Sequence, residues 1–133
     1  MPLKENKRSL KRRPKQNVSE VVNLIGEVKG RNVILFDDIC DTAGTLTAAA
    51  RHLADAGANE IYAGCTHAIL SKDAMAKIMD APITELVVTD TLHLPEEKRT
   101  DKIKRLSVAE IFGKAIMRIH NEESISSLFE EVI

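Results

Sequence analysis

VILFDDICDTAGT, residues 33–45, sets the architecture of this 133-residue chain. Four apolar residues open it, and a run of this kind is typical of a strand buried in a parallel sheet. Two adjacent acids, Asp37 and Asp38, follow, and then a short segment of small and hydroxyl-bearing residues. The next residues, TLTAAARHLADAG, carry a strong helical pattern. The predicted order is therefore strand, paired acids, loop and helix.

This loop has the residues to bind a sugar and an anion together. Acids at the carboxyl end of a parallel strand lie where open α/β sheets bind ligands. The amides that open a helix favour a phosphate, Gly44 gives a ligand access to the backbone, and Thr42 and Thr45 add hydroxyl donors. Asp41 would repel an anion unless it holds a helix-start amide, positions a water or lies near a metal. The pattern predicts a sugar-phosphate site.

The rest of the chain alternates strands with helices, which predicts an α/β fold with a parallel sheet. Strands are expected over 33–37, 60–66 and 86–89, and helices over 45–56, 72–79 and 108–120. Gly57 should end the first helix in a left-handed conformation, and Ser71 can cap the second helix. The segment 95–102 is expected to be a charged loop.

Composition indicates one globular domain with an aliphatic core, because 44% of the residues are hydrophobic and only 3% are aromatic. No apolar run approaches the roughly 20 residues of a membrane helix, and the amino terminus lacks a secretory h-region. Cys40 and Cys65 are expected to be free thiols in a reducing compartment. We therefore expect a cytoplasmic protein with no membrane partner.

The first 16 residues form a basic arm. Seven Lys or Arg against one Glu give this arm a charge of +6, which leaves −7 for the rest of a chain of net charge −1. Such an arm could bind nucleic acid, but it has no aromatic side chain to stack on a base, so we expect no nucleic-acid partner. We expect a disordered arm over 1–16 and one incomplete domain over 17–133.

The central motif resembles the signature of the type I phosphoribosyltransferase fold, and its flanks narrow the likeness. LKRRPKQNVSEVVNLIGEVKGR before it, and GANEIYAGCTHAILS, TELVVTDTLHLPEEK, RLSVAEIFGKAI and NEESISSLFEE after it, resemble the carboxyl-terminal part of ribose-phosphate pyrophosphokinase, or PRPP synthetase. The likeness runs from about Lys11 to Glu131. It implies a three-layer α/β/α domain with a mainly parallel sheet, without the upstream part of that domain.

The resemblance assigns ligands to the central motif. It implies that ribose 5-phosphate binds here, and phosphate or sulfate could occupy the same loop. Asp37 and Asp38 would meet the ribose hydroxyls and could also contact a metal, Mg²⁺ being the cofactor of the family. The residues that match the family's 5-phosphate loop are Asp41, Thr42, Ala43, Gly44 and Thr45.

The resemblance also assigns roles outside this motif. Lys11 and Arg13 match two cations of a mobile catalytic loop that stabilise a transferring pyrophosphoryl group. Ser124 and Ser126 match an allosteric phosphate site, although a plain helix cap explains them equally well. Two departures from the family pattern stand out: Leu10 replaces an acid, and Lys72 and Asp73 replace a glycine-containing loop. His67 is more easily explained as a structural residue than as a ligand.

Three interpretations follow. The first is a fragment of a PRPP synthetase that is inactive alone, binds ATP only if an amino-terminal domain is supplied, and associates with its own copies or with a partner chain. The second is a phosphoribosyltransferase, which would share the central motif but not the Lys-Arg-Arg-Pro segment. The third is a non-catalytic regulatory subunit of a synthetase complex. We favour the first, with a function in nucleotide biosynthesis.

Overall fold

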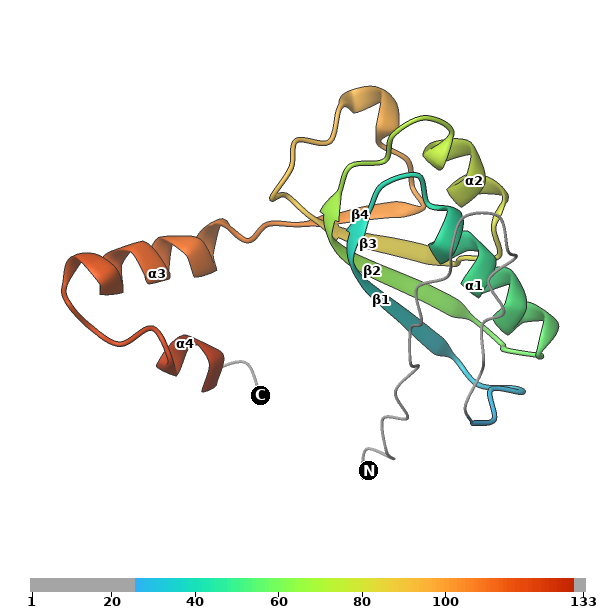
Figure 1. Ribbon diagram of the computed structural model, residues 1–133, viewed down its shortest axis with the longest axis horizontal. Coiled ribbons are helices and arrows are strands. Elements are labelled where there is room, and N and C mark those ends of the chain that lie inside the picture. The colour runs from blue at the N-terminus through green and yellow to red at the C-terminus, as the bar shows by residue number, and fades with distance from the viewer. Residues whose placement is uncertain (1–25, 131–133) are drawn as a thin grey trace, which may run out of the picture.

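The computed structural model describes residues 26–130 and builds them around one four-stranded, all-parallel sheet in the order β1-β2-β3-β4 (Figure 1). The strands are β1 (Val33–Cys40), β2 (Ile61–Ala68), β3 (Glu85–Thr89) and β4 (Ile103–Leu106). The helices are α1 (Gly44–Asp55), α2 (Ala74–Asp80), the short 3-10 helix η1 (Glu96–Lys98), α3 (Ala109–His120) and α4 (Ser127–Glu130). The predicted α/β class with a parallel sheet is confirmed.

Two strands, β1 and β4, differ from the prediction. Strand β1 continues three residues past the predicted end at Asp37 and stops at Cys40. Strand β4 was not predicted at all, because its sequence, IKRL, has only one buried side chain, Ile103. A strand at the edge of a sheet needs little apolar surface, so β4 has only a weak apolar pattern. The charged segment before β4 hides this weak pattern.

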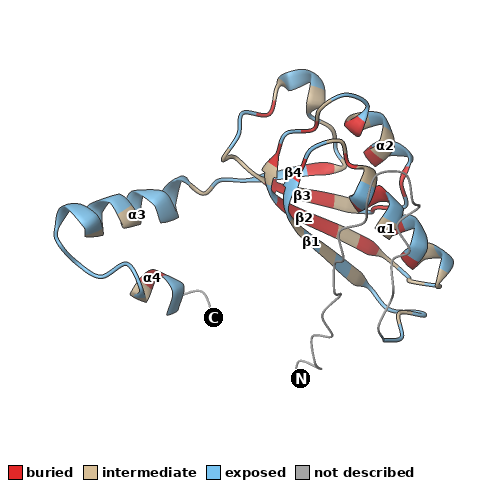
Figure 2. Ribbon diagram, viewed as in Figure 1, coloured by how far each residue is buried: buried red, intermediate tan, exposed pale blue. Residues whose placement is uncertain are grey.

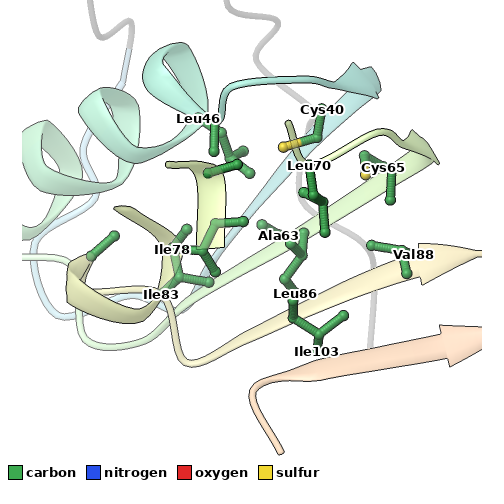
Figure 3. Close-up of a cluster of buried hydrophobic side chains, with 14 of the residues drawn as sticks. Cys40, Leu46, Ala63, Cys65, Leu70, Ile78, Ile83, Leu86, Val88 and Ile103 are labelled. Carbon is green, nitrogen blue, oxygen red and sulfur yellow. The ribbon is translucent and has the colours of Figure 1, made fainter. Parts of the chain in front are cut away.

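Helices α1 and α2 cover one face of the sheet, and the core lies between (Figures 1 and 2). Leu46 from α1 and Ile78 from α2 belong to the same buried cluster as Ala63 of β2, Leu86 of β3 and Ile103 of β4 (Figure 3). Small residues on α1, such as the fully buried Ala50, let the helix approach the strands closely. The predicted aliphatic core is confirmed.

The opposite face of the sheet is open within the described residues. Phe36 of β1 is 82% exposed, and Ile34 and Leu106 on the same face are also exposed. The ring of Phe36 lies over Gly64 of β2, where a β-carbon would come within 3.1 Å of it. Of the three layers that the resemblance implies, the described residues therefore supply two, the sheet and the α1–α2 layer.

Helix α3 projects away from the sheet, with α4 folded back beside it (Figure 1). The large side chains of its apolar stripe are exposed, and α3 has no buried residue in the described part of the chain. The stripe consists of Ile111, Phe112, Ala115, Ile116 and Ile119. None of the helices within residues 26–130 has the length and hydrophobicity that a bilayer span requires.

Candidate functional site

The paired acids lie inside β1 and not after it. Successive strand residues point to opposite faces of a sheet. Because Leu35 packs against the core, Asp37 is placed on the helix-covered face and Asp38 on the open face with Phe36. Each carboxylate also accepts a backbone amide from the next residue: Asp38 N lies 3.0 Å from Asp37 Oδ1, and Ile39 N lies 2.8 Å from Asp38 Oδ1.

The loop after β1 ends in a left-handed residue that starts α1. Ala43 has φ 60° and ψ 9°, and the first amide bonded within the helix is Thr47 N, 3.0 Å from Ala43 O. The amides of the three residues before Thr47 therefore point out of the helix start, as the first amides of an α-helix do. There is no acid in the first turn of α1 to compete for them. This helix start can accept an anion.

The acids and the helix start open into one hollow. It has a volume of about 200 Å³ and is lined by the ten consecutive residues from Asp37 to Leu46. Every residue that the sequence assigned to the sugar-phosphate site lines this hollow. Asp37 and Asp38 of β1 and the first residues of α1 are all part of this lining. One hollow thus offers acceptors for hydroxyl groups and donors for a phosphate.

The segment between β2 and α2 lies along the loop and bonds to it at several points. The amides of Ile69 and Leu70 donate to Cys40 O at 3.0 and 3.1 Å, and the amide of Ser71 donates to Asp41 O at 2.9 Å. The Ser71 hydroxyl donates to the Asp41 carboxylate. The carboxylate of Asp41 therefore has a side-chain partner that the sequence did not predict.

This arrangement corrects the prediction for Ser71. Helix α2 starts at Ala74 with Asp73 as its N-cap residue, so the prediction that Ser71 caps this helix is wrong. The hydroxyl of Ser71 is directed at the loop instead. Lys72, at the position where the resemblance implies a glycine-containing loop, has φ 53°. A residue other than glycine is strained there, which explains why glycine is expected at such a position.

Two cysteines lie behind the hollow, and both are buried free thiols, as predicted. A hydrogen bond with the Cys40 thiol raises the pKa of the Cys65 thiol, and burial and the nearby Asp37 carboxylate raise it further. The same hydrogen bond lowers the pKa of the Cys40 thiol, so the two cysteines differ in acidity. The Cys65 thiol stays neutral and contributes packing.

Other candidates lie outside the hollow. Nδ1 of His67 is 2.8 Å from Oγ1 of Thr91, which supports the structural role expected for this histidine. The Ser124 hydroxyl accepts the amide of Ser126 at 3.2 Å, a local bond at the start of α4, far along the α3–α4 projection from the loop (Figure 1). Lys11, Arg13 and the arm over 1–16 lie outside the described residues.

The described residues offer Mg²⁺ few protein ligands. Among residues 26–130, no three His, Cys, Asp or Glu side chains are grouped closely enough to hold a metal ion. Asp37 and Asp38 are hard oxygen donors of the kind that Mg²⁺ prefers, and this ion commonly takes one or two carboxylates together with substrate phosphates. The donor set therefore fits an ion shared with a phosphorylated ligand.

A family model and several curated proteins match most of this chain. The family model described as "Phosphoribosyl synthetase-associated domain" matches residues 4–130. A ribose-phosphate pyrophosphokinase 1 from Listeria innocua serovar 6a is 55% identical over 120 residues, and a ribose-phosphate pyrophosphokinase from Caldanaerobacter subterraneus subsp. tengcongensis is 58% identical over 119 residues. Each alignment covers 90% of this chain and 38% of the relative.

A solved structure shows the same fold. The crystal structure of phosphoribosylpyrophosphate synthetase from Mycobacterium smegmatis superposes with a TM-score of 0.72 at 34% identity. The match covers 74% of this chain and 33% of that one. The chain thus spans about two fifths of the length of the curated relatives it matches.

Proposed function

This chain belongs to the phosphoribosyl synthetase-associated domain family, and on that premise we propose that it is the carboxyl-terminal part of a ribose-phosphate pyrophosphokinase, with a type I phosphoribosyltransferase fold. Its own contribution is to bind ribose 5-phosphate in the hollow between Asp37 and Leu46. The observation that carries this proposal is the hollow itself, where two carboxylates and an unobstructed helix start come from ten consecutive residues.

The chemistry of the hollow matches the two ends of the ligand. A phosphate dianion is stabilised by the helix-start amides after Ala43 and by the hydroxyls of Thr42 and Thr45. Carboxylates accept hydrogen bonds from sugar hydroxyls, and such charge-assisted bonds are stronger than neutral ones. Asp37 and Asp38 therefore orient the ribose, and the loop anchors its phosphate.

In the reaction of this family, the anomeric hydroxyl of the bound sugar attacks the β-phosphorus of ATP. The new bond joins the sugar oxygen to that phosphorus, the bond from the β-phosphorus to the oxygen bridging the α- and β-phosphates breaks, AMP leaves, and the hydroxyl loses its proton. Lys11 and Arg13 are proposed to stabilise the transferring group. Mg²⁺, when bound, would neutralise phosphate charge, with Asp37 or Asp38 among its ligands. The contacts to ATP are proposed to come from another domain.

Two features of the described residues support a partner chain. The open face of the sheet and the stripe on α3 leave large apolar side chains exposed, among them Phe36 and Phe112. Contiguous exposed apolar surface is typical of protein interfaces. We also keep a cytoplasmic location as part of the proposal, because two buried free thiols suit a reducing compartment. A phosphate site at Ser124 and Ser126 remains a prediction, and their local bonding favours the helix cap.

Isothermal titration calorimetry tests the binding proposal. Asp37→Asn and Asp38→Asn should each weaken ribose 5-phosphate binding about tenfold, since a hydrogen bond to a charged group contributes about 1.5–3 kcal/mol. Affinity for inorganic phosphate should change little, because the helix-start amides remain. Asp55→Asn, at the far end of α1, is the matched control and should bind like the parent. Parent-like affinity of both site variants would refute the assigned roles.

A further inference from the structure

Asp41 places a negative charge inside a loop that should bind an anion. It follows β1 directly and lines the hollow together with the helix start. An aspartate in such a position readily bonds backbone amides two or three residues ahead of it. Here those amides belong to Ala43, whose amide bonds the Cys40 thiol, and to Gly44, the first residue of α1. An unrestrained Asp41 would therefore occupy the Gly44 amide, one of those that a phosphate needs.

The structure shows this carboxylate directed elsewhere. Oδ1 of Asp41 accepts a hydrogen bond from the hydroxyl of Ser71, a residue thirty positions later in the chain. The backbone of the same pair is bonded as well, with Ser71 N 2.9 Å from Asp41 O. Two bonds between the same two residues define both the position of Ser71 and the direction of the carboxylate.

Ser71 is itself held firmly. Its carbonyl accepts the amide of Ala74 at the start of α2, at 3.1 Å. The preceding residue, Leu70, is fully buried in the core even though its φ is 52°. A leucine keeps such a strained backbone only when the surrounding structure enforces it. The hydroxyl of Ser71 therefore acts from a rigid segment and not from a mobile loop.

We propose that Ser71 is a positioning residue for phosphate binding: its hydroxyl holds the Asp41 carboxylate away from the helix-start amides and so keeps them available to the phosphate of the ligand. This inference rests on the proposed function of the same hollow and adds a residue from outside the loop to it. When the hydroxyl is removed, Asp41 is free to rotate toward the start of α1. It then competes with the phosphate for the Gly44 amide and repels the charge of the phosphate.

The test is calorimetric titration of the full chain with ribose 5-phosphate and, separately, with inorganic phosphate. Ser71→Ala should lower the affinity for both ligands about tenfold, as expected when an ionised carboxylate occupies the amide donors that bind phosphate. Ser71→Thr keeps the hydroxyl and should bind like the parent. The matched control is Ser107→Ala, because Ser107 also bonds an aspartate, Asp90, but two strands away from β1.

The distinguishing measurement is suppression by a second substitution. In the Ser71→Ala background, Asp41→Asn removes the competing charge and should recover most of the lost affinity for inorganic phosphate. A purely structural role for Ser71 predicts no recovery, because the second substitution cannot rebuild the segment. Thermal unfolding of each variant shows whether it folds. If Ser71→Ala does not fold, Ser71→Cys keeps the side-chain size, weakens the donor and carries the same prediction.

The outcomes separate the two proposals. If the parent binds neither ligand, the proposed function fails and this inference fails with it. If the parent binds both and Ser71→Ala binds equally well, only the inference is overturned. Weak binding by Ser71→Ala that Asp41→Asn does not recover also overturns it, because Ser71 would then act through loop structure alone.

Discussion

Asp90 joins three elements at the carboxyl edge of the sheet through its backbone and its side chain. It follows β3, its amide donates to Leu106 O of β4 at 3.1 Å, and its Oδ1 accepts the amide of Val108 at the start of α3 at 2.8 Å. The hydroxyl of Ser107, and then the Val108 amide, hold the pKa of Asp90 below its usual range. Both donors favour the ionised carboxylate.

Removing the hydroxyl donor should move this pKa upward. Ser107→Ala is expected to raise the pKa of Asp90 toward its ordinary value, measured by titrating the side-chain carboxyl ¹³C shift. Because the folded-state pKa is the lower one, the stability that Asp90 contributes is present above its unfolded pKa and is lost as the pH falls through the folded pKa. Asp73, whose pKa is lowered by Lys77, is the internal control. An unchanged Asp90 titration would contradict the assigned cause.

Residues of the site that are contiguous in the sequence were predictable, and residues that are distant in the sequence were not. The residues of the hollow were predicted because strand, acids, loop and helix start are contiguous between Asp37 and Leu46. Ser71 was missed as part of the loop because it is thirty positions away and a serine near a helix start is usually a cap. The opposite directions of Asp37 and Asp38 were missed because the strand was expected to end at Asp37, before Asp38.

Gly57 ends helix α1 and directs the chain into β2. Gly57 has φ 87°, its amide donates to Ala54 O at 2.9 Å, and the amide of Ala58 donates to Leu53 O at 3.0 Å. This is the Schellman pattern of helix termination, and it confirms the left-handed cap predicted for Gly57. The termination turns the chain back into β2, which keeps α1 against the sheet and its first turn at the hollow.

A pair of glycine substitutions tests this cap. Gly57→Ala should destabilise the fold by about 1 kcal/mol or more, because alanine is strained at positive φ and its β-carbon would come within 3.2 Å of Lys29 Cγ. Gly113→Ala in α3 is the matched control, since nothing lies within 4 Å of the added carbon. That change should be neutral or stabilising by about 0.5–1 kcal/mol. Urea unfolding measures both, and equal effects would contradict the cap.

Elements were predicted well where one face is buried and poorly where burial is slight. The α1–β2–α2–β3 sequence of elements was expected because its apolar periodicity reflects the core. Strand β4 was missed because charged residues dominate it. The stripe on α3 was predicted from its helical spacing, yet none of its residues is buried within residues 26–130. Periodicity gives the face of a helix and not the surface that covers it.

Taken as a whole, the described residues hold the hollow from Asp37 to Leu46 and one covered face of the sheet. Catalysis of this transfer needs both substrates held in line, and good positioning is equivalent to effective molarities on the order of 10⁵–10⁸ M. A chain spanning 38% of its relatives' length is expected to supply only the sugar side.

The purified chain should therefore release no AMP from ATP above background in the presence of ribose 5-phosphate and Mg²⁺. Adding the remaining domain of a relative, as a separate chain, is the positive arm of the assay. Turnover by the chain alone that Lys11→Ala abolishes would contradict the expectation, since the cations would then act with a nucleotide site formed by this chain or its copies.

Amide chemical shifts during a titration with ribose 5-phosphate show most directly whether this ligand binds at the start of α1. We expect the largest ¹⁵N and ¹H shift changes on residues 41–46, led by Gly44 and Thr45, and we expect inorganic phosphate to perturb the same amides. Ser124 and Ser126 should change little. If nothing binds, or if the changes centre on Ser124 and Ser126 with the loop unaffected, ribose 5-phosphate does not bind at this helix start.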